Sequence, residues 1–316
     1  MSAPEIFPPE PPSPPSAEAN PVFRGPNGIR AGWRALIFLA IIGGLIAVAA
    51  LVIALAVHFL HIGAGSIGAS SLTPAGTGLT EAVIFSLTAI AALVMGRMEH
   101  RKWGEYGLPV KFAFRENFWI GGVIGFLAIS ITLLAIFLAH GFHLTGLATH
   151  GKTLIFPTAA WGTAFIMVGL AEEFAFRGYL QFTLTTGMDY WPAAILLSAL
   201  FGLAHAANPG ETKPGLLSVV CFGLLFCLFL RRTGNLWWAV GFHAGWDWGQ
   251  TFFYGVPDSG LAPYHSFFNS AFNGPHWLTG GSVGPEASVF TPVVLLIVAI
   301  IFSLAYRENQ YHPLGR

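Results

Sequence analysis

The sequence predicts an all-α, polytopic membrane protein with about eight transmembrane helices, and three observations indicate this fold class. Hydrophobic residues make up 54% of the 316 residues, whereas charged residues make up only 9%. A soluble domain carries about 25% charged residues, because charge keeps its surface hydrated. The mean hydropathy is +0.64. Because an alternating barrel pattern is absent, helices are the structure that can satisfy the backbone in lipid.

The apolar residues gather in stretches of a length that suits a bilayer. A hydrocarbon core of about 30 Å needs about 20 helical residues. We predict a membrane domain over 31–316, preceded by a disordered cytoplasmic tail over 1–30, which holds nine of the 21 prolines. The predicted spans lie at 33–60, 80–96, 118–140, 158–184, 191–207, 215–230, 235–253 and 289–306.

The basic residues fall on one side of an eight-span arrangement. Only Lys152 and Lys213 fall on the other side, and Arg177 lies within the fourth span. By the positive-inside rule, both termini are expected in the cytoplasm, with a bacterial inner membrane as the expected location. Because the net charge is zero, we expect no nucleic-acid partner. Membrane lipid is an expected partner because the chain is predicted to span the bilayer. The cytoplasmic set is Arg24, Arg30, Arg34, Arg97, Arg101, Lys102, Lys111, Arg115, Arg231, Arg232, Arg307 and Arg316.

Two connecting loops have distinctive compositions. The loop 97–117 mixes charged residues with aromatic ones, which predicts a short amphipathic helix at the cytoplasmic interface. The loop 254–288 lacks Lys and Arg and is rich in Gly and aromatic residues, so we expect it on the outer side. Whether this second loop forms a lid over a cavity is left open by its composition.

Ionisable residues interrupt three of the apolar spans. An ionised residue at the centre of a membrane helix costs about 2.5–3.5 kcal/mol on insertion scales. These side chains must therefore be paired, neutralised or functional. They are Glu172, Glu173 and Arg177 in the fourth span, His205 in the fifth, and His243 and Asp247 in the seventh.

Helical spacing predicts which of these groups meet. Glu173 and Arg177 are four residues apart and share a face, so they are expected to pair, while Glu172 points about 100° away. Counting about 1.5 Å per residue from the cytoplasmic ends places the remaining groups in one layer. We therefore predict a polar cavity formed by helices 4, 5 and 7. The seventh span also carries a stripe of Gly241, Gly245 and Gly249, which predicts close packing by a neighbouring helix.

This set of residues suits the activation of a water molecule. A carboxylate in an apolar cavity can act as a general base, and a neighbouring imidazole can orient the same water or stabilise an oxyanion. Glu172, His205 and His243 are also a possible ligand set for a hydrolytic zinc ion. The alternatives for each group alone are a hydrogen-bonded structural histidine, an ion or proton site in a carrier, and a helix-locking pair.

Three motifs follow one another across these spans: E-E-x-x-x-R (Glu172, Glu173, Arg177), F-x-x-x-H (Phe201, His205) and H-x-x-x-D (His243, Asp247). In this order the motifs resemble the CPBP intramembrane protease family. That family includes the type II CAAX prenyl endopeptidases and bacterial Abi-type proteins. The resemblance covers about 155–255, and it implies an intramembrane endopeptidase that cuts a peptide or membrane-protein substrate.

The resemblance also implies a role for each motif residue. Glu172 would activate water with the help of His205, His243 and Asp247 would polarise the scissile carbonyl, and Glu173, Arg177 and Phe201 would support the site. Asp247 stands where family members often carry Asn, so it must be protonated, orient His243 or bind a metal. We favour a glutamate peptidase without a cofactor over a zinc metalloendopeptidase, because the sequence has no compact H-E-x-x-H motif. The alternative function is a non-enzymatic membrane protein: an immunity factor, a scaffold or a proton-coupled carrier.

Overall fold

The computed structural model describes residues 22–25, 28–60, 72–149, 151–208 and 210–313. The predicted tail over 1–30 lies largely outside these residues and stays a prediction. The described elements are, in chain order, β1 (Arg24–Gly25), β2 (Gly28–Ile29), α1 (Ala31–Leu60), α2 (Pro74–Met98), the short helices η2 (Trp103–Tyr106) and η3 (Val110–Phe112), α3 (Glu116–Leu138), β3 (Phe142–Leu147), η4 (Gly151–Leu154), α4 (Ile155–Arg177), α5 (Tyr179–Met188), α6 (Tyr190–Ala204), η5 (His205–Ala207), α7 (Lys213–Thr233), α8 (Trp237–Asp247), the π-helix η6 (Trp248–Phe253), β4 (Phe268–Phe272), α9 (His276–Thr279), η7 (Pro285–Ala287) and α10 (Phe290–Ala305).

All eight predicted spans correspond to helices. Within the described ranges, five segments are long and apolar enough to cross a membrane: α1, α2, α3, the pair α4–α5, and α7. The shorter apolar helices α6 and α10 account for the fifth and eighth spans. The seventh span is α8 continued by η6. The predicted all-α, polytopic fold is therefore confirmed.

Local sequence signals set several of the helix ends. Thr73 caps α2 by accepting a hydrogen bond from the backbone N–H of Gly76, and a proline follows the cap. Thr212 caps α7 in the same way, through the N–H of Gly215. Helix α7 ends at Gly234, which adopts a left-handed conformation with φ of 71°. In the loop 97–117, where one short helix is expected, the structure has two short 3₁₀ helices, η2 and η3.

Helices α3 and α8 pack with their backbones in contact. A methyl group on Gly241 would lie 2.0 Å from the carbonyl oxygen of Phe118, and one on Gly245 would lie 2.0 Å from that of Gly122. Only glycine permits this approach, which confirms the packing predicted from the glycine stripe. The packed face of α8 is thereby fixed against α3, and other faces of α8 contact α4, α7 and the cavity described below.

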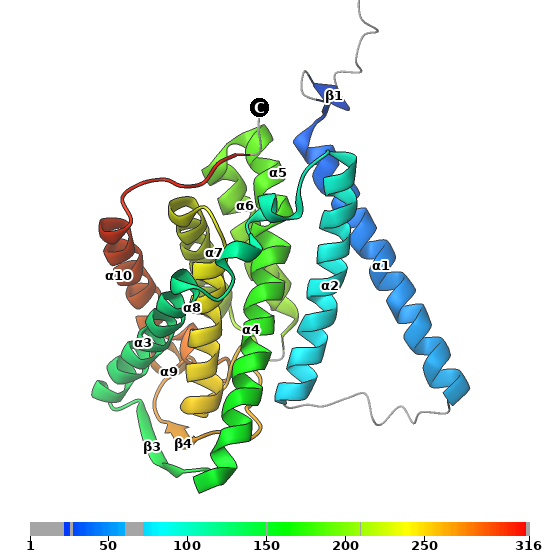
Figure 1. The fold of residues 1–316 in the computed structure, drawn as a ribbon. Helices are drawn as coiled ribbons and strands as arrows, with labels where there is room; N and C mark the ends of the chain where they lie inside the picture. The colour runs from blue at the N-terminus through cyan, green and yellow to red at the C-terminus, as the bar shows by residue number, and fades with distance from the viewer. Residues whose placement is uncertain (1–21, 26–27, 61–71, 150, 209, 314–316) are drawn as a thin grey trace, which may run out of the picture.

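The helices surround a central pair, α4 and α8, as Figure 1 shows. Helix α2 packs along α4, and α3 and α10 lie on the other side of α8. Helix α1 meets α2 and α5 near β1 and then diverges from α2 toward its other end. The segment 254–289 folds over that opposite end, where β4 pairs antiparallel with β3.

Candidate active site

The imidazole of His243 lies among three carboxyl groups. Its Nδ1 is 3.0 Å from Glu173 Oε1. Its Nε2 is 3.5 Å from Asp247 Oδ2 and 3.6 Å from Glu172 Oε2. The ring also stacks on Phe226, with 5.3 Å between centroids. The contact with Glu173 and the stacking fix the ring, so Nε2 is the nitrogen that faces Glu172.

Glu173 also pairs with Arg177. The Arg177 Nη1 atom lies 3.5 Å from Glu173 Oε1, and neither side chain is exposed. The Arg177 guanidinium lies over the ring of Phe201, 4.2 Å from its centroid. The pair predicted from helical spacing is therefore present, and Glu172 is left to face a different partner.

His205 approaches Glu172 from the end of α6. Its Nδ1 lies 2.9 Å from the carbonyl oxygen of Phe201, a backbone acceptor, so Nδ1 carries the proton in this contact. Its Nε2 lies 4.0 Å from Glu172 Oε2. The Phe201 ring packs edge-on against the imidazole. Nε2 is thus left as an acceptor that faces the same carboxylate as His243.

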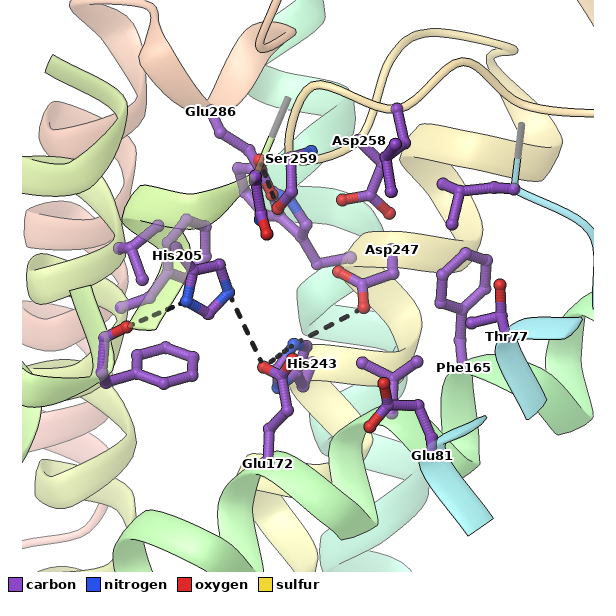
Figure 2. A pocket seen from close by; sticks show the side chains of 18 of the residues that line it. Thr77, Glu81, Phe165, Glu172, His205, His243, Asp247, Asp258, Ser259 and Glu286 are labelled. Atoms are coloured by element: carbon purple, nitrogen blue, oxygen red, sulfur yellow. Dashed lines mark hydrogen bonds and ion pairs between the residues drawn. The ribbon is translucent and has the colours of Figure 1, made fainter. Parts of the chain in front are cut away.

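These groups line one cavity of about 200 Å³ (Figure 2). Glu172 is 24% exposed in its side chain, and its Oε2 atom makes no hydrogen bond to the described residues. A water molecule occupies about 30 Å³ of liquid volume, so the cavity that Glu172 and the two imidazoles line has room for water. The structure therefore brings helices 4, 5 and 7 of the predicted arrangement together around a polar cavity.

The cavity is also lined by polar residues that sequence reasoning missed. Glu81 projects from α2, and Asp258, Ser259 and Glu286 come from the segment 254–289 (Figure 2). A signal was available, since Glu81 is the only acid within α2 and Asp258 and Glu286 are the only acids in that segment. The segment therefore forms part of the wall of the cavity, and a role as a lid stays a prediction.

The two acids from this segment are held in unusual surroundings. Burial raises the pKa of Asp258 to about 6, although a hydrogen bond from the Thr251 hydroxyl, at 2.7 Å, works against the rise. Burial likewise raises the pKa of Glu286 well above its usual range, and the neighbouring Asp258 carboxyl adds to the rise. Glu286 accepts a hydrogen bond from the backbone N–H of Ser259 at 3.0 Å. Both acids are fully buried beside Asp247.

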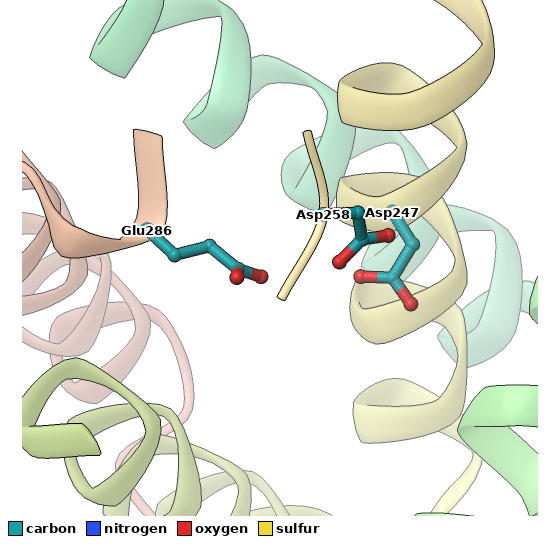
Figure 3. A group of neighbouring side chains, drawn as sticks. All are labelled: Asp247, Asp258 and Glu286. Atoms are coloured by element: carbon teal, nitrogen blue, oxygen red, sulfur yellow. The ribbon is translucent and has the colours of Figure 1, made fainter. Parts of the chain in front are cut away.

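The arrangement of carboxylates bears on metal binding. Within the described ranges, the only group of three metal-ligating side chains with donor atoms within 4.8 Å of one another is Asp247, Asp258 and Glu286 (Figure 3). Its all-oxygen donor set suits a hard cation rather than zinc. Glu172 approaches each imidazole separately, but Glu172, His205 and His243 do not form such a group. The zinc site expected from the sequence therefore stays a prediction.

Comparison with known families agrees with this geometry. Residues 154–249 match the family described as type II CAAX prenyl endopeptidase Rce1-like. No curated protein matches the chain. The matched stretch runs from the start of α4 to the beginning of η6, and it includes all three motifs. The resemblance drawn from those motifs is thus confirmed, since residues 154–249 are similar to the Rce1-like type II CAAX prenyl endopeptidases.

Proposed function

We propose that the protein is an intramembrane endopeptidase of the glutamate type. One observation carries this proposal: Glu172 Oε2 faces Nε2 of both His205 and His243, at 4.0 and 3.6 Å, in a cavity that admits water. The family match supports a protease, and the cavity supplies a carboxylate without a competing hydrogen bond as the base.

The first step is attack by a bound water. Glu172 removes a proton from the water while His205 Nε2 accepts its other hydrogen bond, and the water oxygen adds to the scissile carbonyl carbon. The proton on Nδ1 of His205 is held by the Phe201 carbonyl, which keeps Nε2 free to accept.

The negative charge that develops on the carbonyl oxygen needs hydrogen-bond donors. We assign that role to the Nε2–H of His243 and to the protonated carboxyl of Asp247. Three carboxyl groups crowd at Asp247, so a proton shared among them relieves their repulsion. Collapse of the intermediate then breaks the C–N bond as Glu172 returns its proton to the leaving amine.

The test is cleavage of membrane peptides by purified protein in liposomes. We expect Glu172→Gln and His205→Ala each to lower the rate by about 10²–10⁴-fold, the range for lost general base catalysis. Glu308→Gln, at an exposed position after α10, is the matched control and should cleave at the normal rate. Cleavage at the normal rate by Glu172→Gln would rule out Glu172 as the base. Absence of cleavage by the natural protein would favour the non-enzymatic alternative of an immunity factor, a scaffold or a carrier.

Chelation distinguishes the glutamate mechanism from a metalloprotease. In the glutamate mechanism, we expect activity to persist after prolonged treatment with 1,10-phenanthroline and removal of the chelator–metal complex. Loss of activity that added zinc restores would instead assign the chemistry to a metal.

The proposed topology places both termini in the cytoplasm, in a bacterial inner membrane. The described basic residues of the predicted cytoplasmic set gather near the chain ends and the helix ends beside them, which supports this orientation. Fusions of a periplasm-active and a cytoplasm-active reporter to the C-terminus would test it: only the cytoplasm-active reporter should function.

A further inference from the structure

A second cavity lies at the end of the bundle that carries β1 and the C-terminal segment (Figure 1). It measures about 420 Å³ and forms where the ends of α5 and α7 and the start of α6 meet residues 309–313. Gln310 and Tyr311 donate their backbone N–H groups to the Arg231 carbonyl, at 3.2 and 3.1 Å. The C-terminal segment is thereby fixed as a wall of this cavity, which shares no lining residue with the one around Glu172.

Arg231 supplies a positive charge to this cavity. Its guanidinium lies 4.9 Å from the ring centroid of Tyr190 and 5.5 Å from that of Trp191. The Tyr190 ring is itself held, because its hydroxyl donates to the Cys227 carbonyl. In the part of the chain that the structure describes, no carboxylate lies within 4.0 Å of the guanidinium nitrogens, whereas Arg34, Arg101 and Arg177 each have one. Arg231 is thus a positioned cation whose N–H groups lack an acidic acceptor among the described residues.

Two further hydrogen-bond donors line the same cavity. Tyr311 lines the cavity, and its hydroxyl lies beside the side chain of Thr185. The Asn309 amide oxygen accepts from Arg232 at 3.2 Å, which leaves the amide N–H groups as donors. A cation, a hydroxyl and an amide around one cavity suit a ligand that offers several acceptor oxygens, as a phosphate does.

The position of the cavity favours a lipid over a soluble anion. Trp191 is 40% exposed at the start of α6, and the next turn of this membrane helix exposes Ile195 and Leu196. Tryptophan, tyrosine and arginine at a helix end are typical of headgroup depth, with acyl chains alongside the apolar residues beyond. Asp189 also lines the cavity, so its charge disfavours a free phosphate dianion more than a singly charged phosphodiester.

We propose that this cavity binds the phosphate of a membrane phospholipid, with Arg231 as its charged ligand and Tyr311 and Asn309 as hydrogen-bond donors. The acyl chains lie along the exposed face of α6. The bound lipid joins α6, α7 and the C-terminal segment.

Native mass spectrometry of the full-length protein in detergent tests this site. Three probes are titrated: phosphatidylglycerol, diacylglycerol with the same acyl chains, and inorganic phosphate. We expect phosphatidylglycerol to bind and to raise the melting temperature, with diacylglycerol and millimolar phosphate doing neither. Arg231→Gln should weaken phosphatidylglycerol binding about tenfold, as expected for loss of a charge-assisted pair.

Matched variants complete the test. Lys111→Gln removes another cation that lies over an aromatic ring, Phe112 at 4.6 Å, but lines neither of the two cavities, so binding should be unchanged. Tyr311→Phe keeps the ring and removes only the hydroxyl, with an expected loss of about threefold. If the Arg231→Gln protein does not fold, phosphatidylglycerol binding by the Tyr311→Phe protein is the measurement that tests the proposal. Wild-type binding in the folded variants, equal binding of diacylglycerol, or equal protection by inorganic phosphate would each overturn the proposal.

Discussion

Glu173 Oε1 lies 3.0 Å from His243 Nδ1, and the same oxygen lies 3.5 Å from Arg177 Nη1. One buried carboxylate therefore links the arginine of its own helix to the histidine of a neighbouring helix. The adjacent acid, Glu172, instead faces Nε2 of His205 and of His243, at 4.0 and 3.6 Å, and lines the cavity. Two consecutive glutamates thus have separate tasks, because successive helical residues differ in direction by about 100°.

This division predicts that alanine at Glu173 lowers the stability of the protein, whereas alanine at Glu172 lowers its rate of cleavage. Glu173→Ala should destabilise the protein by about 3–5 kcal/mol, because it leaves Arg177 buried without a carboxylate. Glu172→Ala should change stability by less than about 1 kcal/mol, since its carboxylate borders an open cavity, while abolishing cleavage. Thermal unfolding of both variants in one detergent measures the difference. Equal melting temperatures for the two variants would contradict the assignment.

Asp247 offers a test of the proposed oxyanion contact. Asp247→Asn keeps the shape of the side chain and supplies an N–H donor, so cleavage should stay within about threefold of the normal rate. Asp247→Ala removes the donor and should cost about 10²-fold or more. Steady-state rates at saturating peptide distinguish the two outcomes. Loss of activity in Asp247→Asn equal to that in Asp247→Ala would show that the carboxylate itself is needed.

Asp258 predicts a pH dependence of stability. Its pKa is about 6 in the folded protein, above the ordinary value of 3.8, so the folded state holds the proton more tightly. Between these values the folded state binds more protons than the unfolded state, and stability is lost as pH rises through this window. The full loss is about 3 kcal/mol, from about 1.4 kcal/mol per pKa unit.

The variant Asp258→Asn isolates this effect, since its amide oxygen can still accept from Thr251. It should be more stable than the natural protein at pH 7.5 and about equal to it at pH 4. Melting temperatures measured from pH 4 to pH 8 give the comparison. A difference that does not change with pH would argue against a raised pKa at this position.

The glycine contacts between α3 and α8 predict a strong effect of a single methyl group. Gly245→Ala would place its methyl 2.0 Å from the Gly122 carbonyl oxygen, so the helices must separate, at a cost of about 1–3 kcal/mol or more. Gly43→Ala on α1 is the matched control, because nothing lies within 4 Å of its added methyl. That control should be neutral or stabilising by up to about 1 kcal/mol, the difference in helix propensity. A Gly245→Ala protein as stable as Gly43→Ala would mean that the two helices can adjust.

Much of the site was predictable because its signals are local. The spacing of Glu173 and Arg177 within one helix fixed their pairing, and the glycine stripe of α8 predicted the close approach of another helix. Glu81, Asp258 and Glu286 were missed because they lie outside any recognisable motif. Their place in the cavity wall depends on how α2 and the segment 254–289 pack against the other helices. The two 3₁₀ turns of the loop 97–117 escaped because composition indicates an interface and not a helix type.

The sequence by itself determined the membrane fold, the eight spans and the faces on which the motif residues lie, since hydropathy and the period of 3.6 residues act within single helices. Only the tertiary structure decided that Glu173, rather than Glu172, contacts His243 Nδ1, and that five carboxyl groups line one cavity. Those relationships depend on distances between separate helices and loops, which packing sets and which no spacing along the chain encodes.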